Sequence, residues 1–171
     1  MQEVRGKTIT VSASKTRPSD TNAYTIGDVI NESTSAGTNW TFVLQGPGGN
    51  VGPLGSCILQ SATIISSVSQ STKLEGRLWL FDTDPAADFD NAEFTPTDAE
   101  QLRFLQVVEF PTSAWLTPGA TPANTVCNAQ GLWLPINTTK DANAIYGVLE
   151  ARNAYTPASA EVLTIKLGLI V

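Results

Sequence analysis

The stretch of sequence that decides the fold is Glu161–Val171, EVLTIKLGLIV. Apolar residues recur at every second position, and they are Leu163, Ile165, Leu167, Leu169 and Val171. Successive side chains of a β-strand point to opposite faces of the sheet, so a period of two places all of these on one side. The segment therefore predicts a strand that lies with one face on an apolar core.

Similar segments recur along the chain and predict further strands. They are Lys7–Ser12, Tyr24–Ile30, Trp40–Leu44, Cys57–Val68, Lys73–Phe81, Gln106–Phe110, Leu132–Ile136 and Ala144–Arg152. The stretches between them are rich in Gly, which supplies positive φ angles, and in Pro, which fixes φ, so they predict turns. About eight strands separated by such turns are typical of a β-sandwich. We therefore expect an all-β fold, a single-domain antiparallel β-sandwich that is jelly-roll-like.

One short helix is expected near residues 97–103. Thr97 is of a type that caps helix N-termini, and Glu100 stands three positions later, as a capping box requires. The helix is expected to have about two turns, as the chain soon returns to a strand pattern. Leu102 and Leu105 are expected to face the core.

The chain has 171 residues, which fits one domain able to bury roughly 70% of its unfolded surface. It needs neither disulfides nor metal to fold. Its first 22 residues are polar and end in a loop-like run that contains a proline. We therefore expect a polar N-terminal arm over residues 1–22 and a β-sandwich domain over residues 23–171.

Composition and charge argue against several classes of function. The formal net charge is −6, whereas a nucleic-acid-binding protein needs a basic patch. There is no histidine, which removes any His-dependent triad or zinc site and the commonest general base. No apolar run approaches the ~20 residues of a membrane helix, and the polar start MQEVRGKTIT does not resemble a secretory signal. We expect no cofactor, no membrane partner and synthesis in a cytoplasm.

The acidic segment that follows the strand Lys73–Phe81 is the one place where a metal site is conceivable. The residues that would form a calcium-binding loop are four of its aspartates, Asp82, Asp84, Asp88 and Asp90. Calcium prefers several carboxylate and carbonyl oxygens from one short loop. However, Ala86 and Ala87 stand where an EF-hand requires a ligand and a glycine. The favoured interpretation is a solvated loop whose carboxylates bond nearby amides, and paired carboxylates acting as a glycosidase are a remote alternative.

The cysteines and tryptophans are weighed in the same way. Cys57 and Cys127 either form a redox pair or disulfide or, as we favour, are two small buried hydrophobic residues. Trp79 and Trp133 stand out of phase with their apolar neighbours, so they pack in a second layer or face a partner. Trp115 lies in a loop, where a tryptophan often anchors an interface. The candidate interface residues are Arg5, Lys7, Arg17, Trp79, Trp115 and Trp133.

Three segments carry a resemblance to a known group of proteins. Ala23–Ile30 has the pattern Ala-Tyr-x-x-Gly-Asp-Val-Ile, and Arg77–Leu102 has strand-LFD-x-x-P followed by D-N-x-x-F and D-A-x-x-L. Tyr146–Gly168 runs from Tyr-Gly-Val-Leu to Leu-Thr-Ile-Lys-Leu-Gly. Together they resemble small virion structural proteins of tailed bacteriophages, of the capsid decoration or head type. The resemblance implies a β-sandwich with a structural role, and it carries over no catalytic residues.

The leading hypothesis is a capsid decoration or cement protein that stabilises the head shell. Its partners would be the major capsid protein and further copies of itself, with a homotrimer favoured, and its location the virion, after synthesis in a bacterial host's cytoplasm. The alternative is a tail, baseplate or head-fibre module that binds a host glycan or receptor through aromatic loops. An enzyme is the least favoured class, because the sequence lacks the groups that catalysis needs.

Overall fold

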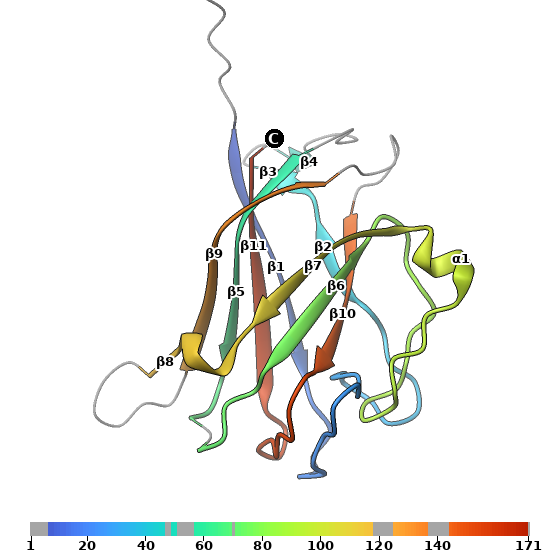
Figure 1. Ribbon diagram of the computed structural model, residues 1–171, viewed down its shortest axis with the longest axis vertical. Helices are drawn as coiled ribbons and strands as arrows, with labels where there is room; N and C mark the ends of the chain where they lie inside the picture. Colours follow the sequence, from blue (N-terminus) through green and yellow to red (C-terminus); the bar gives the residue numbers. More distant parts are fainter. Residues whose placement is uncertain are drawn as a thin grey trace, which may run out of the picture.

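Two antiparallel β-sheets face each other across an apolar core (Figure 1). The computed structural model describes residues 7–46, 49–50, 57–69, 71–117, 125–136 and 144–170, with the backbone alone for residues 45, 46, 49, 50 and 129–136. Sheet 1 has the order β1-β11-β5-β9-β8, with the bounds β1 Thr8–Thr16, β11 Val162–Ile170, β5 Cys57–Ser66, β9 Thr125–Ile136 and β8 Trp115–Leu116. Sheet 2 has the order β2-β10-β6-β7, with the bounds β2 Trp40–Val43, β10 Ala144–Ala151, β6 Gly76–Phe81 and β7 Phe104–Phe110. Gln45–Gly46 (β3) pairs with Gly49–Asn50 (β4).

The strand order is that of a jelly roll. Among the described residues, the strands of four residues or more are β1, β2, β5, β6, β7, β9, β10 and β11. Counted in sequence order, the first, eighth, third and sixth form sheet 1, and the second, seventh, fourth and fifth form sheet 2. The chain therefore crosses between the sheets at nearly every connection, as in the double Greek key. The predicted all-β, jelly-roll-like sandwich with one short helix is confirmed.

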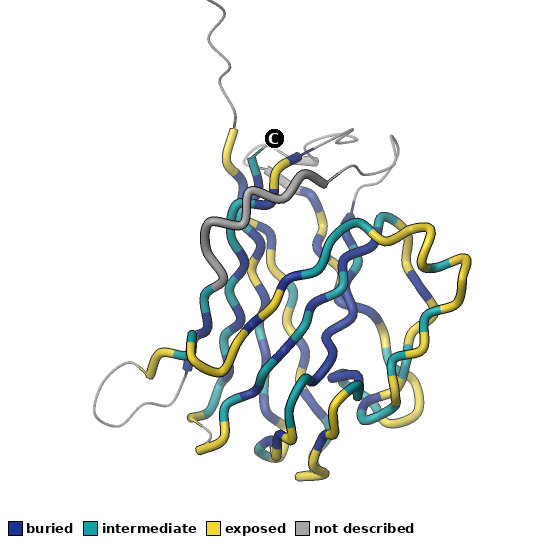
Figure 2. The backbone as a smooth tube through the Cα atoms, viewed as in Figure 1, coloured by how far each residue is buried: buried dark blue, intermediate teal, exposed yellow. Residues whose placement is uncertain are grey.

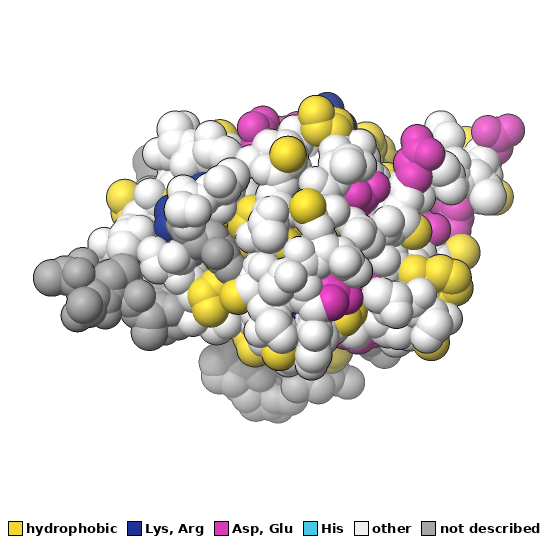
Figure 3. Space-filling view, turned by 90° about the horizontal axis from the view of Figure 1, so that it is seen from below, with side chains coloured by type: hydrophobic (Ala, Val, Ile, Leu, Met, Phe, Trp, Pro, Cys, Tyr) yellow, Lys and Arg dark blue, Asp and Glu magenta, His cyan; other side chains and the backbone are white. Residues whose placement is uncertain are grey.

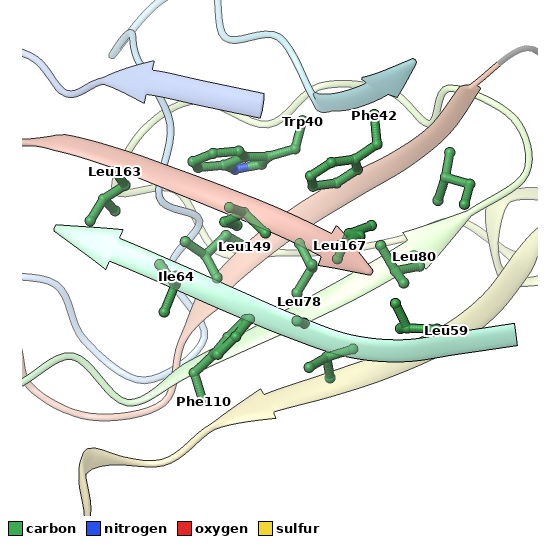
Figure 4. Packing of buried hydrophobic residues seen from close by; sticks show 14 of the residues in the cluster. Trp40, Phe42, Leu59, Ile64, Leu78, Leu80, Phe110, Leu149, Leu163 and Leu167 are labelled. Atoms are coloured by element: carbon green, nitrogen blue, oxygen red, sulfur yellow. The ribbon is translucent and has the colours of Figure 1, made fainter. Parts of the chain in front are cut away.

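The core lies between the sheets and is made by alternate residues of the strands (Figures 2 and 4). Trp40 and Phe42 from β2 pack together with Leu78 and Leu80 from β6 and with residues of β5 and β11. The alternate residues of β11, including Leu163 and Leu167, are at most 1% exposed. The period-two pattern of residues 161–171 is thus an accurate guide to which side faces the core.

The N-terminal segment departs from the expectation of an arm over residues 1–22. Thr8–Thr16 forms β1, which pairs antiparallel with β11 along its whole length. Lys15 breaks the apolar alternation of this strand in the sequence, although it occupies one of the buried positions. It pairs there with Glu32, and its Nζ donates to the carbonyl oxygen of Thr38 at 2.7 Å. Residues 1–6 lie outside the described part of the chain.

The expected strand Tyr24–Ile30 is instead an irregular segment. It makes isolated bridges, such as Tyr24 with Tyr155 and Val29 with Glu150. Gly27 has a φ of 100°, which L side chains rarely adopt, and this turns the backbone out of a continuous strand. Its pattern resembles a strand because Tyr24, Val29 and Ile30 are all buried.

Residues 82–103, which we call the cover segment, join β6 to β7 and lie on the outer side of sheet 2 (Figure 1). They contain α1, Asp98–Gln101, and the predicted capping box is present: Thr97 and Glu100 each bond to the other's backbone N–H. Leu102 was expected to face the core, but it is 86% exposed. The reason is that α1 lies outside the sandwich and buries none of its own residues.

Candidate interaction surface

A second apolar cluster lies on the outer face of sheet 2, between its strands and the cover segment. Val29, Phe81 and Val148 form its buried centre, and Trp79, Phe94 and Tyr146 pack against them. The ring centroids of Trp79 and Phe94 are 5.7 Å apart, and those of Trp79 and Phe104 are 5.5 Å apart with the rings nearly edge to face. Trp79 therefore packs in a second layer, one of the two positions that its phase predicts.

Trp79 is held in place by charged neighbours. Its indole Nε1 donates to Oε2 of Glu150 at 2.7 Å, and Glu150 is only 6% exposed. Arg152 donates from Nη1 to the other carboxylate oxygen, also at 2.7 Å. The guanidinium of Arg77 lies 5.6 Å from the centre of the Trp79 ring, within the range of a cation–π contact. The orientation of the Trp79 ring on this surface is thus set by contacts within the chain.

Two hollows open beside α1. The larger has a volume of about 360 Å³ and is lined by Trp79, Phe81, Pro96, Gln101 and Phe104. The second has a volume of about 200 Å³ and is lined by Phe81, Thr83, Asp84, Pro85, Ala99, Glu100 and Arg103. Figure 3 shows acidic and apolar side chains gathered on this side of the molecule. The surface therefore combines exposed rings with negative charge.

The aspartates of the conceivable calcium loop do not converge on one point. Asp82 pairs with Arg103 at 2.9 Å, and Asp84 accepts from Nδ2 of Asn39 at 2.8 Å. Burial, and then the nearby charge of Glu100, raise the pKa of Asp88. Among the described residues, no group of three or more His, Cys, Asp or Glu side chains is placed to hold a metal ion. The segment instead uses its carboxylates for local bonds.

Asp90 has a structural task that sequence analysis missed. Nη2 of Arg17 donates to its Oδ2 at 2.9 Å, and the Tyr24 hydroxyl and the Asn31 amide donate to its Oδ1 at 2.6 and 2.8 Å. Burial, and then the hydrogen bond to Asp90, raise the pKa of Tyr24. Arg17 is 2% exposed, so it is not a surface contact as expected but ties the cover segment to the chain after β1.

The other candidate interface residues have mixed positions. Lys7 is exposed at the start of β1, whereas Arg5 lies outside the described residues. Trp115 is half-buried, and its Nε1 donates to the carbonyl oxygen of Leu74 at 2.6 Å, so part of the ring stays at the surface. Trp133 lies in β9, but its side chain is outside the described part of the structure.

The cysteines are free and buried, as the favoured interpretation predicts. Cys127 pairs in register with Ile64, seven residues along β5 from Cys57. Burial raises the pKa of each thiol to about 11. Both thiols therefore stay protonated at neutral pH and behave as small apolar side chains.

The three segments that carry the family resemblance meet in space. The amide of Val29 donates to the carbonyl oxygen of Ala92 at 2.7 Å, which joins the first segment to the second. The amide of Ile30 donates to the carbonyl oxygen of Leu149 at 2.8 Å, which joins the first segment to the third. The resemblance therefore follows one packed unit, and not scattered surface positions.

The surface could be found only in part from the sequence. The phase of Trp79 pointed to a second layer, and the run of acidic residues marked the cover segment. The contribution of Phe104 and the pairing of Trp79 with Glu150 depend on contacts between residues up to 71 positions apart. No local pattern encodes contacts of that range.

Comparisons with known proteins find only remote similarities. No model of a known protein family matches the chain, and no curated protein matches it in sequence. The described residues contain no helix that is long and apolar enough to cross a membrane. Similar solved structures include several viral capsid proteins and a bacterial xylanase, all with identities below 25% and TM-scores below 0.5, which is too remote to indicate a function.

Two of these similar structures come from bacteriophages and one from a plant virus. A chain of the cyanophage Pam1 capsid asymmetric unit is 12% identical with a TM-score of 0.34, over 100% of this chain and 89% of that one. A chain of the Helicobacter pylori bacteriophage KHP30 capsid is 8% identical with a TM-score of 0.32, over 98% and 94%. A chain of Desmodium yellow mottle tymovirus is 12% identical with a TM-score of 0.31, over 100% and 90%.

Proposed function

We propose that this protein is a structural component of a bacteriophage virion, and specifically a decoration or cement protein of the head shell. The observation that carries the proposal is that the three segments resembling phage virion proteins pack into one unit, as the bonds of Val29 and Ile30 describe. A shared packed unit indicates a shared fold and not a chance likeness of short patterns. The jelly roll itself is a fold of viral capsid domains, although lectin domains and cupins use it too.

The physical properties of the chain suit such a role. A cement protein needs a stiff scaffold and surfaces that bind neighbouring shell subunits, and the two packed sheets supply the stiffness. Each stable protein contact buries on the order of 1,600 Å². Repetition over many copies turns a modest contact into a large stabilisation of the shell. The partners would be the major capsid protein and further copies of this chain, with a trimer at local three-fold positions.

The contact segments proposed here are residues 1–6 with Lys7, and the region around Trp115. Lys7 is exposed, and part of the Trp115 ring reaches the surface. Removal of residues 1–6 is the matched test, since it leaves β1 intact. We expect lower occupancy on shells after this deletion, and unchanged occupancy would remove the segment from the proposal.

The decisive experiment adds the purified protein to undecorated shells of the source phage. We expect a higher temperature of shell disruption in a thermal scan and a larger force at rupture by atomic force microscopy. Antibody labelling of intact particles should place the protein over the whole head. Unchanged shell stability would contradict the cement role, and label confined to the tail or neck would favour a receptor-binding module.

A further inference from the structure

The two hollows beside α1 lie next to each other and share one residue. Phe81 lines both of them, and it is 2% exposed, so it forms a common floor. Gln101 borders the larger hollow, whereas Ala99 and Glu100 border the smaller one. An extended peptide passing α1 would therefore meet both hollows with side chains two positions apart, because alternate side chains of an extended chain point to the same face.

The larger hollow favours an apolar side chain. Three of its five lining residues are aromatic, a fourth is proline, and Phe104 is 39% exposed. Most of its side-chain N–H donors are already used: Nε1 of Trp79 bonds to Glu150, and one of the two N–H groups of Gln101 Nε2 bonds to the carbonyl oxygen of Pro96 at 3.3 Å. A sugar needs such donors in addition to ring stacking, so a hydrocarbon side chain is the better match.

The smaller hollow is lined by two carboxylates, those of Asp84 and Glu100, and by one guanidinium, that of Arg103. Asp84 accepts from the neutral side chain of Asn39, and its charge also acts on the buried ammonium of Lys15. The Glu100 carboxylate accepts from Thr97 and from the amide of Ala86, and no described ion pair includes it. The bonds to Thr97 and then to Ala86 lower the pKa of Glu100, so its charge is fixed at neutral pH. Arg103 also borders this hollow, but Asp82 and Thr83 hold its guanidinium.

The chain segment that forms most of this hollow is rich in acidic residues. No Lys or Arg occurs from residue 78 to residue 102, and the whole chain has a formal net charge of −6. Such a surface attracts a positive partner and repels a second copy of the same surface. An arginine suits the site better than a lysine. Its planar guanidinium forms two parallel bonds with a carboxylate, which the ammonium of lysine cannot do.

We propose that the two hollows together bind an extended segment of a partner protein that carries an apolar side chain and, two positions from it, an arginine. The apolar side chain enters the larger hollow, and the guanidinium pairs with Glu100 and Asp84 in the smaller one. That the partner is a shell protein rests on the proposed function, whereas recognition of the segment itself does not.

The probe is the peptide acetyl-Gly-Leu-Ser-Arg-Gly-amide, added to the full-length 15N-labelled protein and followed by NMR. We expect the indole N–H signal of Trp79 to shift, while that of Trp40, which is 2% exposed, stays fixed as an internal reference. A dissociation constant on the order of 1 mM is expected for so small a contact. The peptide with citrulline in place of arginine keeps the shape but loses the charge, and should bind at least ~5-fold more weakly.

Matched pairs of variants on α1 and its flank sharpen the test. Glu100→Gln removes the charge in the smaller hollow yet retains a capping-box residue, and it should weaken the arginine peptide by about 5-fold or more. Asp98→Asn removes an equal charge that lines neither hollow and should change binding by less than about 2-fold. Likewise Phe104→Ala should weaken binding, whereas Leu102→Ala, at an exposed position beside it, should not.

Several outcomes would overturn this proposal. They are equal binding of the arginine and citrulline peptides, equal effects of Glu100→Gln and Asp98→Asn, and no shift of Trp79 at about 5 mM peptide. A larger shift with a cello-oligosaccharide would assign the hollows to a glycan. A shift of the Trp79 indole signal with protein concentration alone, without peptide, would show that a second copy of the chain occupies the hollows. The cement role is tested separately, by the stabilisation of shells. If wild type and Glu100→Gln stabilise shells equally, the cement role holds without this site, and the peptide results alone decide whether the hollows bind a segment.

Discussion

The outer faces of the two sheets differ because, among the described residues, only that of sheet 2 lies under a covering segment. On sheet 2 the outward residues of β6 and β10 include Trp79, Phe81 and Val148, and they pack under the cover segment. On sheet 1 the outward residues of β1 are Thr8, Thr10, Ser12, Ser14 and Thr16, and all of them are exposed. Antiparallel strand pairing thus supports an apolar outer face where the cover segment packs on the sheet, and a hydroxyl-rich outer face where the strand is exposed.

This difference separates two sources of stability. The covered face adds a second apolar cluster to the main core, so substitutions there should cost as much as core substitutions. The bare face meets water, where small polar side chains contribute only cross-strand pairs. Substitutions on the two faces therefore measure how much the cover segment contributes.

The largest effect is expected for Phe81→Ala. Phe81 is 2% exposed at the centre of the covered cluster, so truncation leaves a cavity that the surroundings fill only in part. We expect a loss of about 3–5 kcal/mol in the free energy of unfolding, measured by denaturant titration. Thr10→Ala on the bare face is the control, with a change within about 0.5 kcal/mol. Similar losses in both variants would mean that the cover segment does not protect sheet 2.

The second largest effect is expected at the buried ion pair between Arg17 and Asp90, which joins the cover segment to the chain after β1. Asp90→Asn retains an acceptor for Tyr24 and Asn31 but removes the buried counter-charge of Arg17, whose guanidinium keeps only the longer ion pair with Asp20 at 3.5 Å. We expect a loss of about 3 kcal/mol, since removing one partner of a buried ion pair is costly. Asp98→Asn, on exposed α1, should be nearly neutral in the same denaturation experiment. A neutral Asp90→Asn would show that the cover is held by its apolar contacts alone.

A smaller, local effect should follow acidification. Hydrogen bonds from Thr97 and then Ala86 lower the pKa of Glu100 from its ordinary value of 4.5. Its contribution is therefore fully present above pH 4.5 and is lost as the pH falls through the lowered pKa. NMR should show the amides of Thr97 and Ala86 titrating together, with a midpoint below 4.5, before the strands of sheet 1 respond. Loss of all amide signals in one step would contradict a local role.

The smallest effect is expected on the bare face. Ser14 and Thr164 share a hydrogen bond of 2.8 Å between their hydroxyls across β1 and β11, and the pair is exposed. Ser14→Ala should cost less than about 1 kcal/mol in the same denaturant titration, because water replaces the lost partner. A cost near that of Phe81→Ala would indicate that the bare face is buried by another copy under the conditions used.

The sequence predicts what depends on neighbouring residues. Alternation predicts the inward face of β11, and the spacing of Thr97 and Glu100 predicts the cap of α1. It fails for Leu102, which is exposed because a sequence pattern does not tell on which side of a sheet a helix lies. β10 shows no clean alternation, since its residues are buried on both faces, the outer one by the cover segment.

The candidate surface was harder to predict than the fold. The acidic run and the phase of Trp79 marked its position, but its shape depends on Phe81, Phe104 and α1 meeting around two hollows. Arg17 was expected to be an interface residue in the polar N-terminal arm, yet it is buried, and Asp90 supplies its charge partner from 73 residues away. Pairing over such a distance in sequence becomes visible only in the folded chain.

The pairing of β1 with β11 sets the order of events during synthesis. β11 lies between β1 and β5, and Thr8 pairs with Ile170, so sheet 1 has a gap until nearly the whole described chain has left the ribosome. Until then β1 and β5 each present an unpaired edge to other nascent chains. Chains truncated before β11 should therefore yield aggregates and not partly folded monomers, so solubility depends on translation through Ile170.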